Sequence, residues 1–402
     1  MGISLGAAPI DRAFLSQDRL DLPTRGRLSL LPWKGQFTPE FVDVLLDVYL
    51  PKGGSVLDPF AGSGTVLFEA SRRGVASHGA EINDAALAFC HVAELRSTDV
   101  AYRQDLLAEA RSLLRQWPQH GDTKLRLWDH AQPTTALIEA ARHDANLWHL
   151  VCAAAVLAQV AYAKLGRSSV LKALARIGEI VLESTQPLRS CSVYRADARG
   201  LPIGGASVDL VVTSPPYINV HNYHQYGRVA VELLGGNPLE AARSEIGANR
   251  KFRQNRFFTV VQYAIDMAEV LVELRRVLNP LGRAIFVVGR ESRVRGISFQ
   301  NGRLLIELAR RGGLFEVQRR MERSFINRFG AVIFEDIIEL VPTIQAGTTS
   351  VGRSVGIDFL RDALCGQVDE AQGRDLESAL AQAKSIEPSP YLSPTERTVV
   401  AV

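Results

Sequence analysis

The sequence predicts an α/β fold built on a doubly wound sheet of seven strands, with a helical insertion. The segment 55–81 has the pattern of strand, glycine turn, helix and strand, which is the first half of a nucleotide-binding βαβ unit. The apolar, β-rich run 208–212 stops at two prolines, as a buried strand does when it leads into a rigid loop. The runs 315–322 and 334–341 have the pattern of an antiparallel hairpin at a sheet edge.

Length and composition are those of a globular protein with one large domain or two. The chain has 402 residues, of which 47% are hydrophobic and 22% charged. No run approaches the ~20 apolar residues of a membrane span, and the N-terminus lacks the basic segment of a signal peptide. The four cysteines are scattered without Cys-x-x-Cys spacing, which favours reduced thiols and argues against a metal site. We therefore expect a cytoplasmic protein that binds no metal and contacts no membrane.

Changes of pattern along the chain predict four segments. Residues 1–97 hold the N-terminal segment and the first half of the sheet domain. Residues 98–190 show helical apolar spacing where a doubly wound domain would have one helix, and so predict an inserted helical subdomain. Residues 191–342 resume and complete the sheet. Residues 343–402 change to Gly, Ser, Thr and mixed charge, and are expected to form a loose tail with one helix near 356–365.

Local signals predict the elements of the first half. Thr38 is a plausible N-cap with Pro39 at the first helical position, and Gly74 ends the helix that follows the glycine turn. In chain order the predicted elements are helix 41–50, strand 55–58, helix 66–74 and strand 76–81.

The later elements follow from apolar periodicity. In the insertion the predicted helices are 104–117, 134–149, 151–165 and 169–184. In the second half they are helices 257–277 and 302–311 and strands 192–198, 208–212, 283–289, 315–322 and 334–341.

The glycine turn has the sequence Asp58-Pro-Phe-Ala-Gly-Ser-Gly-Thr65. Its glycines let the backbone approach a ligand closely. It is not a phosphate loop, because Gly-x-x-x-x-Gly-Lys-Ser/Thr is absent. Glu81 ends the next strand, where an acid can accept both ribose hydroxyls of an adenosine. Asp197 ends the third strand and is a candidate to accept an adenine amino group, although an ordinary turn acid is the alternative.

The loop Thr213-Ser-Pro-Pro-Tyr217 follows strand 208–212, at the edge where open α/β sheets bind ligands. Ser214 Oγ and the Pro215 carbonyl can accept hydrogen bonds from an exocyclic amine. Such bonds draw its nitrogen towards a tetrahedral, nucleophilic geometry. Tyr217 can stack on the base, an interaction worth roughly 1–3 kcal/mol. The alternative is that the two prolines merely end the strand.

Arginine outnumbers lysine 39 to 7, although the net charge is only +3. Aromatic and basic residues gather after the Pro-Pro loop, and a mobile basic loop is expected over 243–256. Guanidinium groups suit phosphates and aromatic rings suit bases; packing on a helix face or a solvated surface is the alternative. The candidates for nucleic-acid contact are His221, Tyr223, Arg228, Arg250, Lys251, Arg253 and Arg256.

Taken together, the glycine turn and the Pro-Pro loop resemble the motifs of amino-group DNA methyltransferases that depend on S-adenosylmethionine. These enzymes are typical of restriction-modification systems. The resemblance covers about residues 30–97 and 191–342, and implies a Rossmann-like seven-stranded sheet whose last strand is antiparallel. The implied catalytic loop, which holds a flipped base, is Ser214, Pro215, Pro216 and Tyr217. The implied cofactor site is Phe37, Asp58, Pro59, Phe60, Gly62, Gly64, Thr65, Glu81 and Asp197.

The resemblance favours the cytosine 4-amino group as the target, because Ser at the position of Ser214 is commonest in enzymes with that specificity. The adenine 6-amino group stays open, because the glycine motif here precedes the catalytic loop, the reverse of many Ser-Pro-Pro-Tyr members. Ring-carbon methylation is excluded, since no cysteine follows a proline. An RNA amino-group methyltransferase and a non-catalytic DNA-binding subunit stay open as well. The expected partners are DNA and a cognate restriction endonuclease, with the oligomeric state left open.

Overall fold

The structure is a computed structural model, and every structural statement below concerns the residues that it describes. These are residues 8–22, 31–33, 35–116, 141–163, 165–183, 189–218, 222–233, 236–248, 251–326, 330–344, 348 and 350–392.

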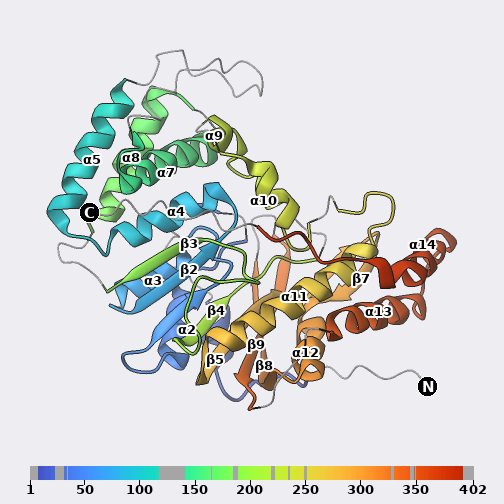
Figure 1. Cartoon of the computed structure of the whole chain (residues 1–402). Coiled ribbons are helices and arrows are strands. Elements are labelled where there is room, and N and C mark those ends of the chain that lie inside the picture. The colour runs from blue at the N-terminus through green and yellow to red at the C-terminus, as the bar shows by residue number, and fades with distance from the viewer. Residues whose placement is uncertain are drawn as a thin grey trace.

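A seven-stranded sheet forms the centre of the molecule (Figure 1). Its strand order is β3-β2-β1-β4-β5-β9-β8. Strands β1 to β5 run parallel, and β9 is antiparallel to both β5 and β8. The predicted fold class is therefore confirmed. The strands are β1 (Ser55–Asp58), β2 (Ala76–Glu81), β3 (Cys191–Arg195), β4 (Val208–Thr213), β5 (Leu278–Gly289), β8 (Phe315–Ile326) and β9 (Val332–Pro342).

Helices cover both faces of this sheet, so neighbouring residues of a strand face different cores. In β4, Leu210 and Val212 pack in the cluster of α2, whereas Val211 lies in the cluster of α11. Burial on both sides explains the nearly continuous apolar run of this parallel strand. One face is covered by α1 (Gln17–Asp21), α2 (Pro39–Tyr49) and α3 (Thr65–Arg72), the other by α11 (Phe258–Val277) and α12 (Asn301–Gly312). Helix α13 (Val351–Leu364) packs on α11 and α12.

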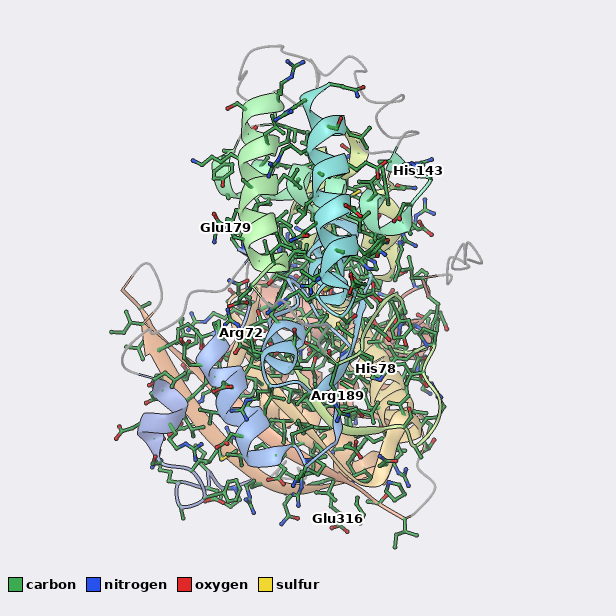
Figure 2. The ribbon with its side chains drawn as sticks, turned by 90° about the vertical axis from the view of Figure 1, so that its left-hand side faces the viewer. Arg72, His78, His143, Glu179, Arg189 and Glu316 are labelled. Atoms are coloured by element: carbon green, nitrogen blue, oxygen red, sulfur yellow. The ribbon has the colours of Figure 1, made fainter. Side chains whose placement is uncertain are left out.

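The inserted helices form a layer of their own beside α4 (Asp84–Leu95). They are α5 (Val100–Arg115), α7 (Ala145–Tyr162) and α8 (Arg167–Val181). Figure 2 shows this layer standing at one end of the molecule, with Glu179 and His143 on it and Glu316 of β8 at the far end.

Helix α7 differs from the prediction, because it runs without a break through positions 149–151 where two helices were expected to meet. The part of the predicted helix 134–149 before residue 141 lies outside the described residues. By length and composition α7 is also the one helix of the described part that could cross a membrane. In this fold it packs against α4, α5 and α8, which accounts for its apolar sequence.

Residues 351–392 differ from the loose tail that composition predicted. Helix α13 lies against α11, followed by α14 (Glu370–Gln382) and the 3-10 turn η2 (Ala383–Ser385). Gly352 and Gly356 allow this packing, because a Cβ at either position would come within 2.7 Å of the α11 backbone. Val355, Phe359 and Leu360 are buried in the same core as α11, so the helix predicted near 356–365 exists as part of α13 and is docked.

The sequence patterns also missed a small hairpin, β6 (Glu291–Val294) and β7 (Ile297–Gln300). Its two-residue turn, Arg295 and Gly296, has positive φ at both positions, which is the geometry of a tight hairpin turn. Two short helices after the Pro-Pro loop were missed as well: α9 (Arg228–Leu233) and α10 (Pro238–Ser244).

Candidate active site

A cavity of about 1110 Å³, which includes its open mouth, lies at the carboxyl ends of β1 and β4. From β1 the chain proceeds to β2 and β3 on one side of the sheet, and β4 and β5 lie on the other. The carboxyl ends of β1 and β4 therefore flank the topological switch point, where open α/β sheets bind ligands. Residues of the glycine turn and of the Pro-Pro loop both line the cavity.

The glycine turn depends on two backbone conformations that suit glycine. Gly62 has a φ of +54° and Gly64 a φ of +80°, both in the left-handed region. Gly64 is also the N-cap of α3. A Cβ at Gly62 would lie 3.3 Å from Trp33 Cδ1, so a side chain at this position would narrow the cavity, which both residues line.

The carboxylate of Glu81 holds this turn in place from the end of β2. Its Oε2 accepts the N–H of Gly62 at 2.9 Å, and its Oε1 accepts the N–H groups of Ile82 and Asn83 at 2.8 Å each. Burial raises the pKa of Glu81 to about 7, although the three backbone N–H groups act in the opposite direction. Glu81 lines the cavity, as predicted for a group that accepts ribose hydroxyls.

Asp58 joins the two motifs. Its Oδ1 accepts the hydroxyl of Thr213 at 2.7 Å and the N–H of Phe60 at 3.1 Å. Burial raises the pKa of Asp58 to about 7. A carboxylate buried in this way is stabilised by any cation that enters the cavity.

In the Pro-Pro loop, Ser214 and Tyr217 face each other, with 3.3 Å between Ser214 Oγ and the Tyr217 hydroxyl. Both residues and Pro216 line the cavity, while Pro215 is buried behind them. The Tyr217 ring lies on Gly289 of β5, where a Cβ would come within 3.0 Å of it. Burial raises the pKa of the Tyr217 hydroxyl far above its usual value, so this group stays protonated.

The segment before α2 covers the cavity from the side of the glycine turn. Ser63 Oγ donates to Gln36 Oε1 at 2.8 Å, which ties this segment to the turn. Phe37 is buried, lines the cavity and contacts Phe41 of α2, with ring centroids 6.0 Å apart. Phe37 thus lines the same cavity as the glycine turn, and its role towards the cofactor stays a prediction.

Residues 223–246 contribute the remaining wall, of which only Tyr223 was among the predicted site residues. His224 and Glu245 are both buried, and His224 Nδ1 lies 2.7 Å from Glu245 Oε2. Glu245 also accepts the N–H of Tyr223, and Asn83 Nδ2 donates to the Tyr223 carbonyl at 2.8 Å. One feature of the sequence could have indicated Glu245 as a site residue: it is the only carboxylate between Arg243 and Arg256, in an otherwise basic segment.

The other predicted cofactor residues fall in different places. Pro59, Phe60 and Thr65 line the cavity. Asp197 also lines it, but both of its carboxylate oxygens accept hydrogen bonds from Arg199, at 2.9 and 2.7 Å. Whether Asp197 binds an adenine therefore stays a prediction.

The predicted nucleic-acid contacts separate into several groups. Tyr223 lines the cavity, Arg228 Nε pairs with Glu232 at 2.7 Å, and Lys251 Nζ bonds to the Ser389 hydroxyl. Arg253 and Arg256 are exposed, and the structure shows no ion pair for either within the described ranges. His221 and Arg250 lie outside the described residues.

The cavity suits a ligand with a cationic part and an adenosine part. Four acids line it (Asp58, Glu81, Asp197 and Glu245), while no described lysine or arginine does. A nucleotide with phosphates would be repelled by such a lining, whereas a sulfonium with an amino group complements it. The chemistry of the lining thus fits S-adenosylmethionine, with Asp58 and Glu81 beside the glycine turn as its acceptors.

The fold brings a glycine turn at the end of one strand and a Ser-Pro-Pro-Tyr loop at the end of the next into one cavity. Residues 24–91 of this chain match the family model described as DNA methylase. That match confirms the resemblance inferred from the motifs and agrees with S-adenosylmethionine as the cofactor. It covers the glycine turn and Glu81 but ends before the Pro-Pro loop.

Comparison with solved structures finds proteins of low identity. An S-adenosylmethionine-dependent methyltransferase from Methanosarcina mazei is 13% identical, with 75% of this chain and 98% of that chain covered and a TM-score of 0.34. The rRNA methyltransferase aviRa from Streptomyces viridochromogenes is 12% identical, with 78% and 88% covered and a TM-score of 0.33. No curated protein matches the chain. Similarities at these TM-scores say nothing of the substrate.

Proposed function

We propose that this protein is a DNA methyltransferase that transfers a methyl group from S-adenosylmethionine to the exocyclic 4-amino nitrogen of a flipped cytosine in double-stranded DNA. The observation that carries the proposal is the hydrogen bond between Thr213 and Asp58. It joins the glycine turn and the Ser-Pro-Pro-Tyr loop at adjacent strand ends, within one cavity lined by acids. A cofactor site and an amine-binding loop are thus within reach of each other.

The bound cofactor would supply a methyl group already activated on sulfur, so the protein mainly has to align donor and acceptor. Asp58, Glu81 and the glycine turn hold the cofactor end of this alignment. Ser214 Oγ holds the amine from the other side, and the Pro215 carbonyl, the second predicted acceptor, belongs to a buried residue outside the cavity lining. Tyr217 is supported by Gly289 and offers a flat face at the mouth of the loop. A flipped base is needed because the amine is inaccessible inside a base stack.

Cytosine is proposed over adenine because, in the family that the two motifs resemble, Ser at the position of Ser214 is commonest in enzymes that act on the cytosine 4-amino group. The adenine 6-amino group is the second candidate, favoured by the order of the two motifs along the chain. We further propose a cytoplasmic enzyme of a restriction-modification system that works beside a cognate endonuclease.

The test is methylation of mixed-sequence duplex DNA with labelled cofactor, followed by mass spectrometry of the nucleosides. Methyl on the cytosine 4-amino nitrogen is the expected result, and a Ser214→Ala variant should lose most of it. Methyl on adenine would overturn the choice of base but retain the class. Cofactor binding without any methylated DNA nucleoside, together with methylation of RNA, would contradict DNA as the substrate. Failure to bind cofactor at all would favour a non-catalytic subunit.

A further inference from the structure

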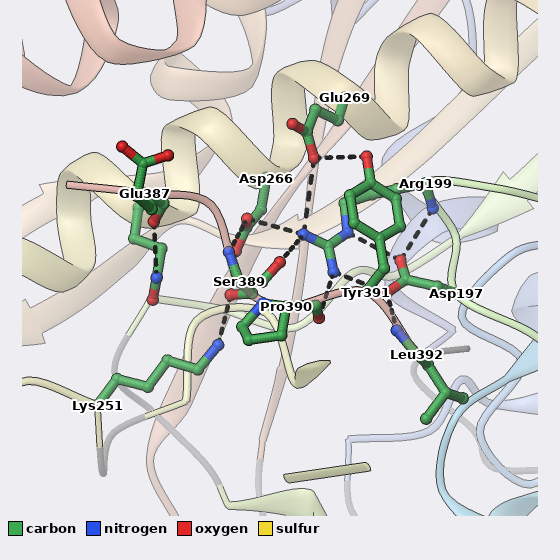
Figure 3. A network of polar contacts seen from close by, with 11 residues as sticks. Asp197, Arg199, Lys251, Asp266, Glu269, Glu387, Ser389, Pro390, Tyr391 and Leu392 are labelled. Atoms are coloured by element: carbon green, nitrogen blue, oxygen red, sulfur yellow. Dashed lines mark hydrogen bonds and ion pairs between the residues drawn. The ribbon is translucent and has the colours of Figure 1, made fainter. Parts of the chain in front are cut away.

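Arg199, which follows β3 by four residues, has every donor of its buried guanidinium engaged (Figure 3). Nε and Nη2 donate to the two oxygens of Asp197, and Nη1 donates to Asp266 Oδ1 at 3.1 Å. The remaining donors go to backbone carbonyls, from Nη1 to Ser389 at 2.7 Å and from Nη2 to Pro390 at 3.0 Å. Arginine has five N–H donors, so this set leaves none unpaired.

The two carbonyls belong to residues 386–392, here called the C-terminal strap. The strap crosses from η2 to the end of β3, as Figure 3 shows in part. Ser389 is buried and bonds to Asp266 through both its N–H and its hydroxyl, at 2.8 and 2.5 Å. The Tyr391 ring covers Arg199, with 4.2 Å between the guanidinium carbon and the ring centroid.

The strap also reaches Asp197 directly, because the N–H of Leu392 donates to Asp197 Oδ2 at 3.4 Å. Asp197 and its neighbours Ala196 and Ala198 line the cavity. A segment about 190 residues further along the chain therefore holds the cavity wall at the end of β3.

A second interaction leads from the strap to the catalytic loop. Lys251 Nζ donates to the Ser389 hydroxyl. Lys251 follows Gly247, whose backbone is so close to the Pro-Pro loop that a Cβ would lie 2.8 Å from the Tyr217 carbonyl oxygen. The strap thus contacts the cavity wall at Asp197 and also Lys251, four residues after Gly247.

We propose that Arg199 and the C-terminal strap are positioning elements of the cofactor site, which hold Asp197 and the β3 end in the geometry that binds S-adenosylmethionine. The inference rests on the proposed function, because it assigns the cofactor to this cavity. Without the strap, two N–H donors of Arg199 lose their acceptors in a buried site. Arg199 and Asp197 would then move to recover partners, and the cavity wall would move with them.

A purely structural role of this buried network is the competing explanation, since ion pairs of this kind can simply stabilise or specify a fold. The two explanations differ in what calorimetry measures. Loss of folded protein lowers the number of binding sites but leaves the dissociation constant unchanged. Displacement of the cavity wall raises the dissociation constant at full occupancy of sites.

The test compares two truncated chains, one that ends at Ser385 and lacks the strap, and one that ends at Leu392 and keeps every strap interaction described above. S-adenosylhomocysteine, the product form of the cofactor, is the calorimetric probe. We expect the Leu392 chain to bind like the full chain, and the Ser385 chain to bind about 10-fold more weakly or worse, because small displacements in a site have effects of this size. At saturating cofactor its kcat should be largely retained, while its KM for cofactor rises.

A surface substitution makes the test independent of truncation. Tyr391→Ala removes the ring over Arg199, and Leu281→Ala removes a side chain 93% exposed on β5 as a control. Tyr391→Ala should weaken binding about 5-fold, which is the worth of a cation–π interaction, and Leu281→Ala should not. Unchanged dissociation constants in the Ser385 chain and in Tyr391→Ala would overturn the inference but leave the proposed function intact. Absence of binding in the full chain would overturn both.

Discussion

The hydroxyl of Thr213 donates a 2.7 Å hydrogen bond to Oδ1 of Asp58, and both side chains are buried. Thr213 is the last residue of β4 and Asp58 the last of β1, and these strands are neighbours in the sheet. The bond therefore fixes the distance between the start of the glycine turn and the start of the Pro-Pro loop. Donor and acceptor of the methyl group would be aligned across it.

Thr213→Val should lower both stability and catalytic efficiency, because valine keeps the shape of threonine but has no hydroxyl. Loss of a hydrogen bond to a buried carboxylate costs about 1.5–3 kcal/mol of unfolding free energy. Denaturant unfolding would measure this loss, and steady-state kinetics should show a roughly 10-fold lower kcat. Thr213→Ser retains the hydroxyl and should stay close to wild type. Equal damage in both variants would show that packing, rather than the bond, matters here.

Tyr217→Ala should weaken the grip on the target base but spare cofactor binding. Stacking on a base is worth roughly 1–3 kcal/mol, so KM for DNA or kcat should change by about 5- to 150-fold. The control Tyr217→Phe keeps the ring and loses only the hydroxyl near Ser214. Calorimetry with S-adenosylhomocysteine should give one dissociation constant for all three proteins. A parallel loss of cofactor affinity in Tyr217→Ala would contradict the assigned roles.

The stability of the cofactor-free protein should fall with rising pH through the range in which Asp58 ionises. Burial raises its pKa from 3.8 to about 7, so the folded state holds the proton more tightly than the unfolded chain. The stabilisation from the bound proton is complete below about pH 3.8 and is lost as pH rises through about 7. Asp58→Asn removes the share of this dependence that comes from Asp58, worth roughly 2–4 kcal/mol, and should make the curve of unfolding free energy against pH less steep between 4 and 7, while Glu81 keeps its own share. If the wild-type and Asp58→Asn curves had the same shape, the raised pKa of Asp58 would be refuted.

A cationic ligand that enters the cavity should displace protons near neutral pH. It would favour the ionised forms of Asp58 and Glu81, whose pKa values are both raised to about 7. Binding of S-adenosylmethionine at pH 7 should therefore release protons, and affinity should rise with pH through 7. Calorimetry in buffers of different ionisation enthalpy measures the number released. Proton uptake on binding, or an affinity that falls as pH rises through 7, would show that the cationic part of the ligand does not lie beside Asp58 and Glu81.

Neutralising Arg253 and Arg256 should reduce the salt dependence of DNA binding. Both are exposed, and no ion pair is seen for either in the part of the chain that is described. For each phosphate that is no longer neutralised, the slope of log K against log salt should fall by about 0.9. Arg361 and Arg374 of the C-terminal helices pair with Asp358 and Glu370, and serve as the control pair. An equal change of slope in both double variants would show that Arg253 and Arg256 are ordinary solvated surface residues that make no specific phosphate contact.

Sequence alone determined the sheet and the place of its two loops. Strands such as 55–58 and 208–212 are short runs rich in β-branched and apolar residues. Gly62 and Gly64 have positive φ, which few other residues adopt, and the two prolines stop a strand because they lack a backbone N–H donor. These signals are local, so they are legible without a structure. The carboxyl ends of neighbouring parallel strands meet at one edge, which is why Asp58 and Ser214 could be expected together.

Only the tertiary structure decided the partners of the charged residues. Lys251, a candidate for binding phosphate, bonds to Ser389 in this structure, and Asp197 is held by Arg199 and by a strap near the end of the chain. The composition of residues 343–402 predicted a loose tail, yet Gly356 packs on α11 and Ser389 is buried against Asp266. A charge or a glycine looks the same in a sequence whether it faces solvent or a buried partner. That choice depends mostly on interactions between segments far apart in the chain, which the fold alone brings together.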